Sequence, residues 1–97
     1  MNAVANVKEV TLKFYSDPAH GWLEVPKSVA RLHLRDKYLQ ISCFSHMRGN
    51  TLYLEEDCDA PLLIQAMREA GLNVKFEELD MDDSPIRQYD GFVAYIN

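Results

Sequence analysis

Residues 38–55 read YLQISCFSHMRGNTLYLE. Apolar side chains recur at every second position over Tyr38–His46 and again over Thr51–Glu55, which is the period of a half-buried strand. Gly49 and Asn50 lie between the two runs, and both residue types tolerate the positive φ of a hairpin turn. The stretch therefore predicts an antiparallel β-hairpin. The buried face of its first strand is expected to hold Leu39, Ile41 and Cys43.

The segment before the hairpin predicts two strands and a short helix. Val7–Tyr15 alternates and contains β-branched and aromatic residues, and Gly21–Val25 is a shorter strand that ends at Pro26. A helix is expected from Lys27 to about Arg35, because a proline suits the first helical turn. Its apolar side is expected to include Val29 and Leu32. Its exposed basic face is expected to hold Lys27, Arg31 and Arg35.

The segment after the hairpin predicts a second helix over about Ala60–Ala70. Asp57 or Asp59 can accept hydrogen bonds from the amides of its first turn, and Pro61 fits early in that turn. Gly71 follows, where a left-handed residue commonly ends a helix. The apolar stripe of this helix is Leu62, Leu63, Ala66, Met67 and Ala70.

The last third predicts a strand, an acidic loop and an edge strand. Leu72–Glu78 alternates, residues 79–91 are rich in aspartate, and Phe92–Ile96 is again apolar. The inward positions of the first of these strands are Leu72, Val74 and Phe76. The order β-β-α-β-β-α-β predicts an α+β fold with a mainly antiparallel sheet and two helices, in a single domain over residues 1–97.

Composition predicts one folded, soluble domain. The 97 residues are 47% hydrophobic and 26% charged, and the net charge is −5. That charge argues against a general nucleic-acid binder, which carries a basic footprint. Residues 1–48 carry +3 and residues 49–97 carry −8. With neither an 18-residue apolar run nor a signal peptide, a cytoplasmic protein is expected.

The residues that serve metal sites and enzymes lack the expected spacing. The three histidines and two cysteines show no zinc-ligand pattern, and the glycines are isolated turn residues. Ser28, Ser42 and Ser45 fall within predicted regular elements. We therefore expect no enzyme, no metal and no cofactor. Cys43 and Cys58 are expected to be reduced and buried, with a disulfide between them as the alternative.

Acidic residues recur at alternate positions in two places, Glu55-Asp57-Asp59 and Glu78-Asp80-Asp82. In an extended chain alternate residues lie about 6.6 Å apart, a spacing comparable to that of successive phosphates on a DNA strand. The rows could therefore imitate a phosphate backbone. Helix capping and a solvated loop are the simpler explanation of the same residues. The candidate partner-binding residues are Glu55, Glu56, Asp57, Asp59, Glu77, Glu78, Asp80, Asp82 and Asp83.

The basic stripe of the first helix offers an alternative function. Lys27, Arg31 and Arg35 are four residues apart, so they share one side of a helix. Such a stripe could contact nucleic acid or an acidic protein, which would make the chain a small adaptor. A solvated helix face explains the same stripe.

Four separated blocks resemble a group of small uncharacterised proteins from phages and mobile elements. The blocks are DPxHGWLxVP (17–26), IS (41–42), YLEEDCDA (53–60) and SPIRxY (84–89). The likeness spans roughly residues 15–90 and brings no known function with it. The chain departs from the group's pattern between His33 and Tyr38, where a helix-ending glycine is expected.

In its length, acidity and mobile-element character, the chain is similar in kind to the DNA-mimicking anti-CRISPR inhibitors of the type I-F surveillance complex. That resemblance implies a phage protein acting in the host cytoplasm, as a monomer. It also implies a partner, the lysines and arginines that receive target DNA near the PAM-reading subunits. Direct binding to nucleic acid or a membrane is not expected.

Overall fold

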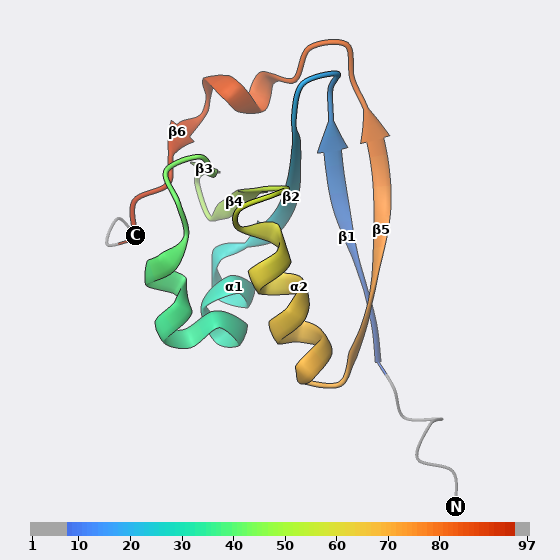
Figure 1. Cartoon of the computed structure of the whole chain (residues 1–97), viewed down its shortest axis with the longest axis vertical. Helices are drawn as coiled ribbons and strands as arrows, with labels where there is room; N and C mark the ends of the chain where they lie inside the picture. The colour runs from blue at the N-terminus through green and yellow to red at the C-terminus, as the bar shows by residue number, and fades with distance from the viewer. Residues whose placement is uncertain (1–7, 95–97) are drawn as a thin grey trace, which may run out of the picture.

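The computed structural model describes residues 8–94, and its centre is a six-stranded sheet in the order β5-β1-β2-β4-β3-β6 (Figure 1). All pairs are antiparallel except β1 with β5, so the fold is α+β with a mainly antiparallel sheet, as predicted. The strands are β1 (Lys8–Ser16), β2 (Gly21–Pro26), β3 (His46–Arg48), β4 (Thr51–Glu55), β5 (Leu72–Asp80) and β6 (Asp90–Gly91). The helices are α1 (Lys27–Leu34), α2 (Ala60–Glu69) and the short 3₁₀ helices η2 (Arg35–Gln40) and η3 (Pro85–Gln88).

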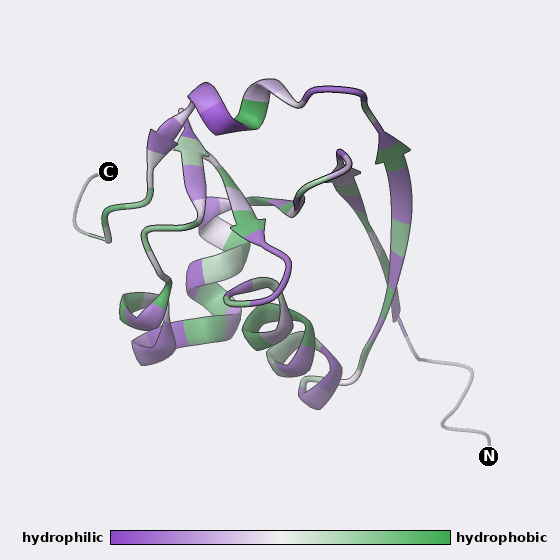
Figure 2. Cartoon of the chain, turned by 45° about the horizontal axis from the view of Figure 1, so that its top comes forward, coloured by the Kyte–Doolittle hydropathy of each residue, from purple (hydrophilic) through white to green (hydrophobic). Residues whose placement is uncertain are grey.

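The core lies between the central strands and the two α-helices. Alternation in β2 and β4 points Leu23, Val25, Leu52 and Leu54 to one face of the sheet, where all four are fully buried. Buried residues of α1 and α2 complete the cluster, among them Ala30, Leu34, Leu63 and Met67. Figure 2 shows hydrophobic and hydrophilic residues alternating along β5. The buried residue of this strand, Val74, lies in its first half.

The hairpin turn is confirmed, but the strand predicted over Tyr38–His46 is wrong. Gly49 has φ +58° between β3 and β4. Only His46 of the predicted strand is in β3, because residues 38–40 belong to η2 and residues 41–45 are irregular. Tyr38 and Ile41 are buried while Leu39 and Cys43 are exposed, which is the three-residue period of a 3₁₀ turn. Tyr38 packs edge-on against Phe92, with ring centroids 5.3 Å apart.

Helix α1 forms where predicted, with a different buried face. Ala30 and Leu34 point inward and Leu32 is exposed. Lys27 is only 6% exposed, so the predicted basic face is reduced to Arg31 and Arg35. Lys27 follows directly on β2, and its amide donates to the Asn50 carbonyl at 2.8 Å.

The C-terminal elements follow the prediction only in part. Gly71 ends α2 with φ +89°, as expected. The segment after β5 crosses one end of the sheet to β6 at the opposite edge (Figure 1), and buries Ser84 and Ile86 instead of forming a purely exposed loop. The strand predicted over Phe92–Ile96 is wrong for its described residues, because β6 ends at Gly91 and Phe92 is buried in the core. Val7, Tyr95 and Ile96 lie outside the described residues.

Between residues 8 and 94, no helix is both long and apolar enough to cross a membrane.

Arg35 occupies the position where a helix-ending glycine was expected. Its φ of +52° and ψ of −120° are values that side chains with a Cβ adopt at a cost of about 1–3 kcal/mol. Glycine adopts them freely but gains entropy in the unfolded chain. We expect Arg35→Gly to raise the free energy of unfolding by about 1 kcal/mol, measured by urea denaturation.

The matched control is Asp36→Gly. Asp36 is the next residue and has no positive φ, so glycine there brings only the entropic cost and should lower the free energy of unfolding. Equal effects of the two substitutions would contradict the assignment of strain to Arg35.

Candidate functional site

The turn that joins β4 to α2, residues 56–59, borders two surface hollows. The larger, of about 570 Å³, is the histidine-lined hollow, between this turn, the β1–β2 turn and the residues before β3. The smaller, of about 290 Å³, is the phenylalanine-lined hollow, between the turn, the start of α2 and the β1–β5 pair. The lining includes His20, Trp22, His46, Cys58 and Arg87 in the first hollow, and Phe14, Glu56, Ile64, Phe76 and Glu78 in the second.

Asp17 fixes the β1–β2 turn, which forms one wall of the histidine-lined hollow. Its Oδ1 accepts hydrogen bonds from the Ala19 and His20 amides, both at 3.0 Å, and so closes the β1–β2 turn. Its Oδ2 accepts from the Ser84 amide at 3.2 Å and pairs with the Arg87 guanidinium. Burial alone would raise the pKa of Asp17, but the His20 amide, Arg87 and the other amides outweigh it and hold that pKa far below its ordinary value.

Trp22 forms the floor of the same hollow. It is 3% exposed, and the rings of His20 and His46 lie 5.8 and 6.1 Å from its own. The Arg87 guanidinium lies over its face at 5.4 Å, a cation–π contact. His46 is oriented by the contact of its Nδ1 with the Tyr89 carbonyl at 3.0 Å. The indole nitrogen of Trp22 has no hydrogen-bond partner within residues 8–94.

Asp59 does not cap α2 with its side chain, contrary to the sequence interpretation. It stands at the N-cap position, but its carboxylate turns away from the helix amides. It accepts from the Ser42 amide at 3.0 Å, the Ser42 hydroxyl at 2.6 Å and the Ser45 hydroxyl at 2.5 Å. Ser42 and Ser45 therefore lie in an irregular segment, where their hydroxyls anchor the chain between η2 and β3, and not in a strand.

Glu55 is likewise used inside the molecule. Its Oε1 accepts from the Asp57 and Cys58 amides at 2.9 and 2.8 Å and so shapes the 56–59 turn. A hydrogen bond to Glu55, burial, and the Glu55, Asp59 and Asp57 charges raise the pKa of the Cys58 thiol. Cys43 and Cys58 are free thiols, but both are exposed, so the expectation that they are buried is wrong. A raised pKa keeps Cys58 as the thiol, which is the unreactive form.

The nine predicted acidic residues separate into distinct groups. Glu55 and Asp59 are buried, at 8% and 2% exposure, and so they are not surface contacts. Glu77 lies on the opposite face of β5 from Glu78, and Asp83 pairs with Arg87 at 3.9 Å. The remaining five are exposed or half-exposed and, among the described residues, have no ion pair with a Lys or Arg. We call them the acidic face: Glu56, Asp57, Glu78, Asp80 and Asp82.

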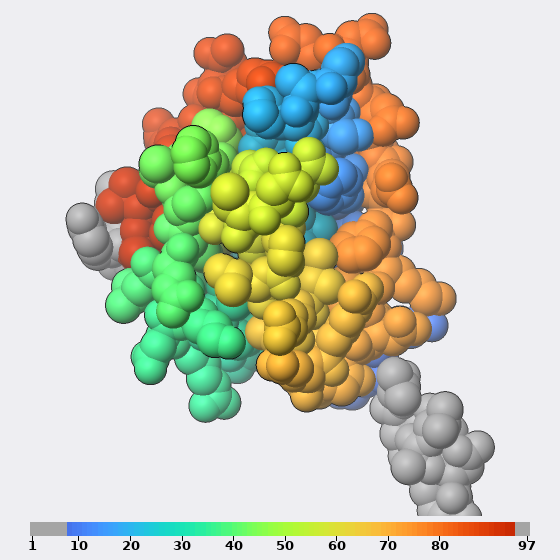
Figure 3. All heavy atoms as spheres, in the orientation of Figure 1, coloured from blue at the N-terminus to red at the C-terminus, as the bar shows by residue number. Residues whose placement is uncertain are grey.

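The fold brings the two acidic segments together. Glu56 from the turn and Glu78 from β5 line the same phenylalanine-lined hollow. Figure 3 shows the turn (yellow-green) and β5 (orange) on the same side of the molecule. Glu55, Glu56 and Asp57 have carboxylate oxygens within 4.8 Å of one another, although Glu55 already accepts two amide hydrogen bonds. The expectation of no metal stays a prediction.

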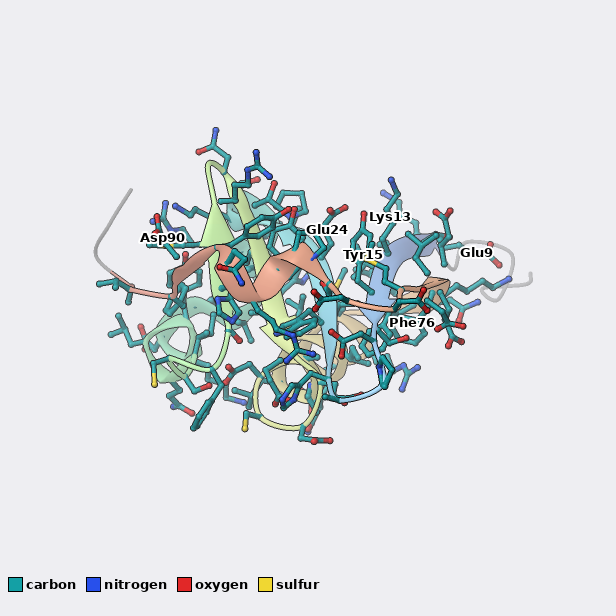
Figure 4. The ribbon with its side chains drawn as sticks, turned by 90° about the horizontal axis from the view of Figure 1, so that it is seen from above. Glu9, Lys13, Tyr15, Glu24, Phe76 and Asp90 are labelled. Atoms are coloured by element: carbon teal, nitrogen blue, oxygen red, sulfur yellow. The ribbon has the colours of Figure 1, made fainter. Side chains whose placement is uncertain are left out.

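The open face of the sheet carries a different set of side chains. Figure 4 shows Lys13, Tyr15 and Glu24 on one side of the sheet and Phe76 on the other. The Tyr15 and Tyr53 rings lie 6.3 Å apart, and the Tyr15 hydroxyl donates to Glu24 at 3.4 Å. Burial and the Glu24 charge raise the pKa of Tyr53 to about 12, so this phenol is neutral at physiological pH. Tyr15 thus contacts both Tyr53 and Glu24 on this face, which is opposite to the face that carries Glu78.

Sequence reasoning did not predict the histidine-lined hollow, although its signal was present. Three of the four blocks that carry the resemblance supply its walls: His20 and Trp22 from the first, Cys58 from the third and Arg87 from the fourth. Ser42, from the remaining block, is held to the third block by Asp59. Comparison with family models, curated proteins and solved structures found no match.

The role of Asp59 can be tested by removing its carboxylate. We expect Asp59→Ala to lower the free energy of unfolding by about 3 kcal/mol, because the half-buried Ser42 amide and the buried Ser45 hydroxyl lose their acceptor. Asp57→Ala is the control, since Asp57 is exposed two residues away. Urea denaturation of both variants measures the difference, and equal losses would show that Asp59 has no special structural role.

Asp17 predicts a specific pH dependence of stability. Its folded pKa lies below its ordinary value of 3.8, so its stabilising contribution is complete above about pH 4 and is lost as the pH falls further. Asp17→Asn should lower Tm by several degrees at pH 7 and by progressively less below pH 4. Thermal melts from pH 7 to pH 2 measure this, and a constant difference between the proteins would contradict the pKa assignment.

Proposed function

We propose that this protein is a non-enzymatic inhibitor that binds the cationic, DNA-receiving surface of a protein complex through its acidic face. The specific candidate is a phage-encoded anti-CRISPR protein that acts as a monomer in the host cytoplasm. Its partner would be the type I-F CRISPR surveillance complex, at the lysines and arginines of the PAM-reading subunits. The observation that carries the proposal is that Glu56 and Glu78 line one hollow, while within residues 8–94 Asp57, Asp80 and Asp82 also have no ion pair with a Lys or Arg.

The spacing of the acids supports an electrostatic imitation of a nucleic-acid strand. Glu78 and Asp80 are alternate residues of β5, so their side chains leave the same face of the strand about 6.6 Å apart. Asp82 follows where the chain bends, and Glu56 and Asp57 add charge from the neighbouring turn. A surface of one sign attracts a basic channel at long range and speeds association with it.

The geometry of the possible nucleophiles supports a function without catalysis. The Ser42 and Ser45 hydroxyls both donate to the Asp59 carboxylate, so that they are committed to holding a loop. Cys58 has a raised pKa beside Glu55. A nucleophilic thiol requires the opposite arrangement, in which a neighbouring base or positive charge lowers the thiol pKa and favours the thiolate.

The alternative, a nucleic-acid or host-protein adaptor working through the basic helix, is weaker. It depends on three basic residues, and Lys27 is buried. Arg31 packs over the Tyr38 ring at 5.2 Å, which leaves it partly engaged with its own helix region. A gel shift of the isolated protein separates the two functions, because an imitation of DNA does not retard DNA.

Competition with target DNA tests the proposal. Added protein should displace duplex from the purified surveillance complex, and raising the salt from about 50 to about 200 mM should weaken the inhibition, because the contact is ionic. The triple variant Glu56→Gln, Glu78→Gln, Asp80→Asn should lose at least tenfold in inhibitory potency. Electrophoretic mobility of labelled duplex is the measurement.

The matched control neutralises three exposed acids elsewhere, by Glu69→Gln, Glu77→Gln and Asp90→Asn. It changes the net charge equally but leaves the acidic face intact, so its potency should stay within about twofold of the original protein. Unchanged duplex binding at saturating protein would exclude this partner. Equal loss in both variants would show that net charge, and not the acidic face, is responsible.

A further inference from the structure

The phenylalanine-lined hollow combines an apolar floor with a charged rim. Phe14 and Phe76 come from adjacent parallel strands, and Ala60 and Ile64 come from successive turns of α2. Glu56 and Glu78 stand at its edge. Its volume of about 290 Å³ is at the lower limit of ligand pockets, which suits one long side chain better than a whole small molecule.

Register and close packing fix the position of the rim carboxylates beside the rings. Phe14 is the direct partner of Glu78 across the β1–β5 pair, so both side chains leave the same face. On the other side, a Cβ on Gly21 would stand 2.5 Å from the Phe14 ring and 3.0 Å from Glu56 Oε2. Phe14 therefore has a carboxylate near its ring on both sides, and a glycine is required at position 21 for that approach.

Phe76 and the two glutamates remain available to a partner. Phe76 is 38% exposed, although its alternation places it on the helix-covered face of β5. Figure 4 shows it on the opposite side of the β1–β5 pair from Lys13. Among residues 8–94, Glu56 and Glu78 have no ion pair with a Lys or Arg. An aromatic surface between two unpaired carboxylates is therefore open to an external cation.

We infer that this hollow is the receptor for a single arginine side chain of the protein partner. A guanidinium is planar, so it can stack on a phenyl ring while its N–H groups reach carboxylates at the rim. Its three-carbon stem would cover the apolar floor, as long cationic side chains do. A lysine ammonium is more strongly hydrated and lacks the flat face. The inference rests on the proposed function only for the identity of the partner.

The probe is N-acetyl-arginine methylamide, titrated into the ¹⁵N-labelled full-length protein and followed by NMR. We expect saturable shifts confined to Phe14, Glu56, Ile64, Phe76 and Glu78, with a dissociation constant in the millimolar range, as for other small fragments. The lysine analogue should bind at least threefold more weakly, and the uncharged norleucine analogue at least tenfold more weakly. Equal binding of the norleucine analogue would overturn the inference. Equal binding of the lysine analogue would overturn the assignment to arginine.

Two variants test the two parts of the hollow. Glu56→Gln with Glu78→Gln should weaken the arginine probe at least tenfold, and Phe76→Leu should weaken it about threefold by removing a ring while keeping the floor apolar. Glu77→Gln is the matched control, because Glu77 adjoins Glu78 but points to the other face of β5. It should leave the dissociation constant unchanged. The dispersion of each NMR spectrum shows that the variant is folded.

The outcome is separable from the test of the proposed function. Probe binding with no effect on the surveillance complex would leave the arginine receptor standing and remove only that partner. Inhibition of the complex that needs the glutamates, but is unaffected by Phe76→Leu and accompanied by no probe binding, would overturn the receptor and keep the inhibitor. Absence of probe binding in the original protein overturns the inference on its own.

Discussion

The Asp17 carboxylate is the contact on which the arrangement of this chain most depends. One oxygen closes the β1–β2 turn, and the other holds the Ser84 amide and the Arg87 guanidinium. Residues 81–89 must travel from β5 at one edge of the sheet to β6 at the other, and Asp17 attaches that crossing to the sheet between its two edges. Arg87, fixed in this way, covers Trp22. A single buried carboxylate thus links the turn, the crossing segment and the wall of the larger hollow.

The blocks that carry the resemblance are therefore explained largely by internal contacts. Asp17, Ser42, Asp59, Ser84 and Arg87 all belong to those blocks, and all five bind one another or nearby backbone. Residues used in this way define turns and loop anchors, which a related chain would need in order to adopt the same shape. They do not by themselves describe a partner. The residues that can do so are those whose side chains have no hydrogen bond or ion pair within residues 8–94. On this basis Glu56 and Glu78 are better candidates than Glu55 and Asp59.

Sequence patterns correctly predicted the elements whose conformation is determined by residues close to one another in the sequence. Alternation located β1, β2, β4 and most of β5, and glycine at positions 49 and 71 marked the turn and the helix end. The strand expected over Tyr38–His46 failed because its conformation is decided by distant groups. Asp59 captures the Ser42 amide and the Ser45 hydroxyl, and Phe92 receives the Tyr38 ring. Lys27 was predicted on an exposed face because helix spacing alone does not reveal that the first residue of α1, directly after β2, is buried.

In the acidic rows, residue spacing determines which side chains share a face, whereas strand pairing determines which residues lie beside that face. Alternation predicts that Glu78 and Asp80 share the inward face of Phe76, but it cannot say which strand is paired with theirs or in which register. The parallel register of β1 with β5 decides this, because it sets Glu78 opposite Phe14 and Glu77 opposite Lys13. A shift by one residue would exchange the two glutamates and leave the net charge of −5 unaltered. The net charge therefore does not indicate which glutamate of β5 faces the phenylalanine-lined hollow. The register of β1 with β5 determines this.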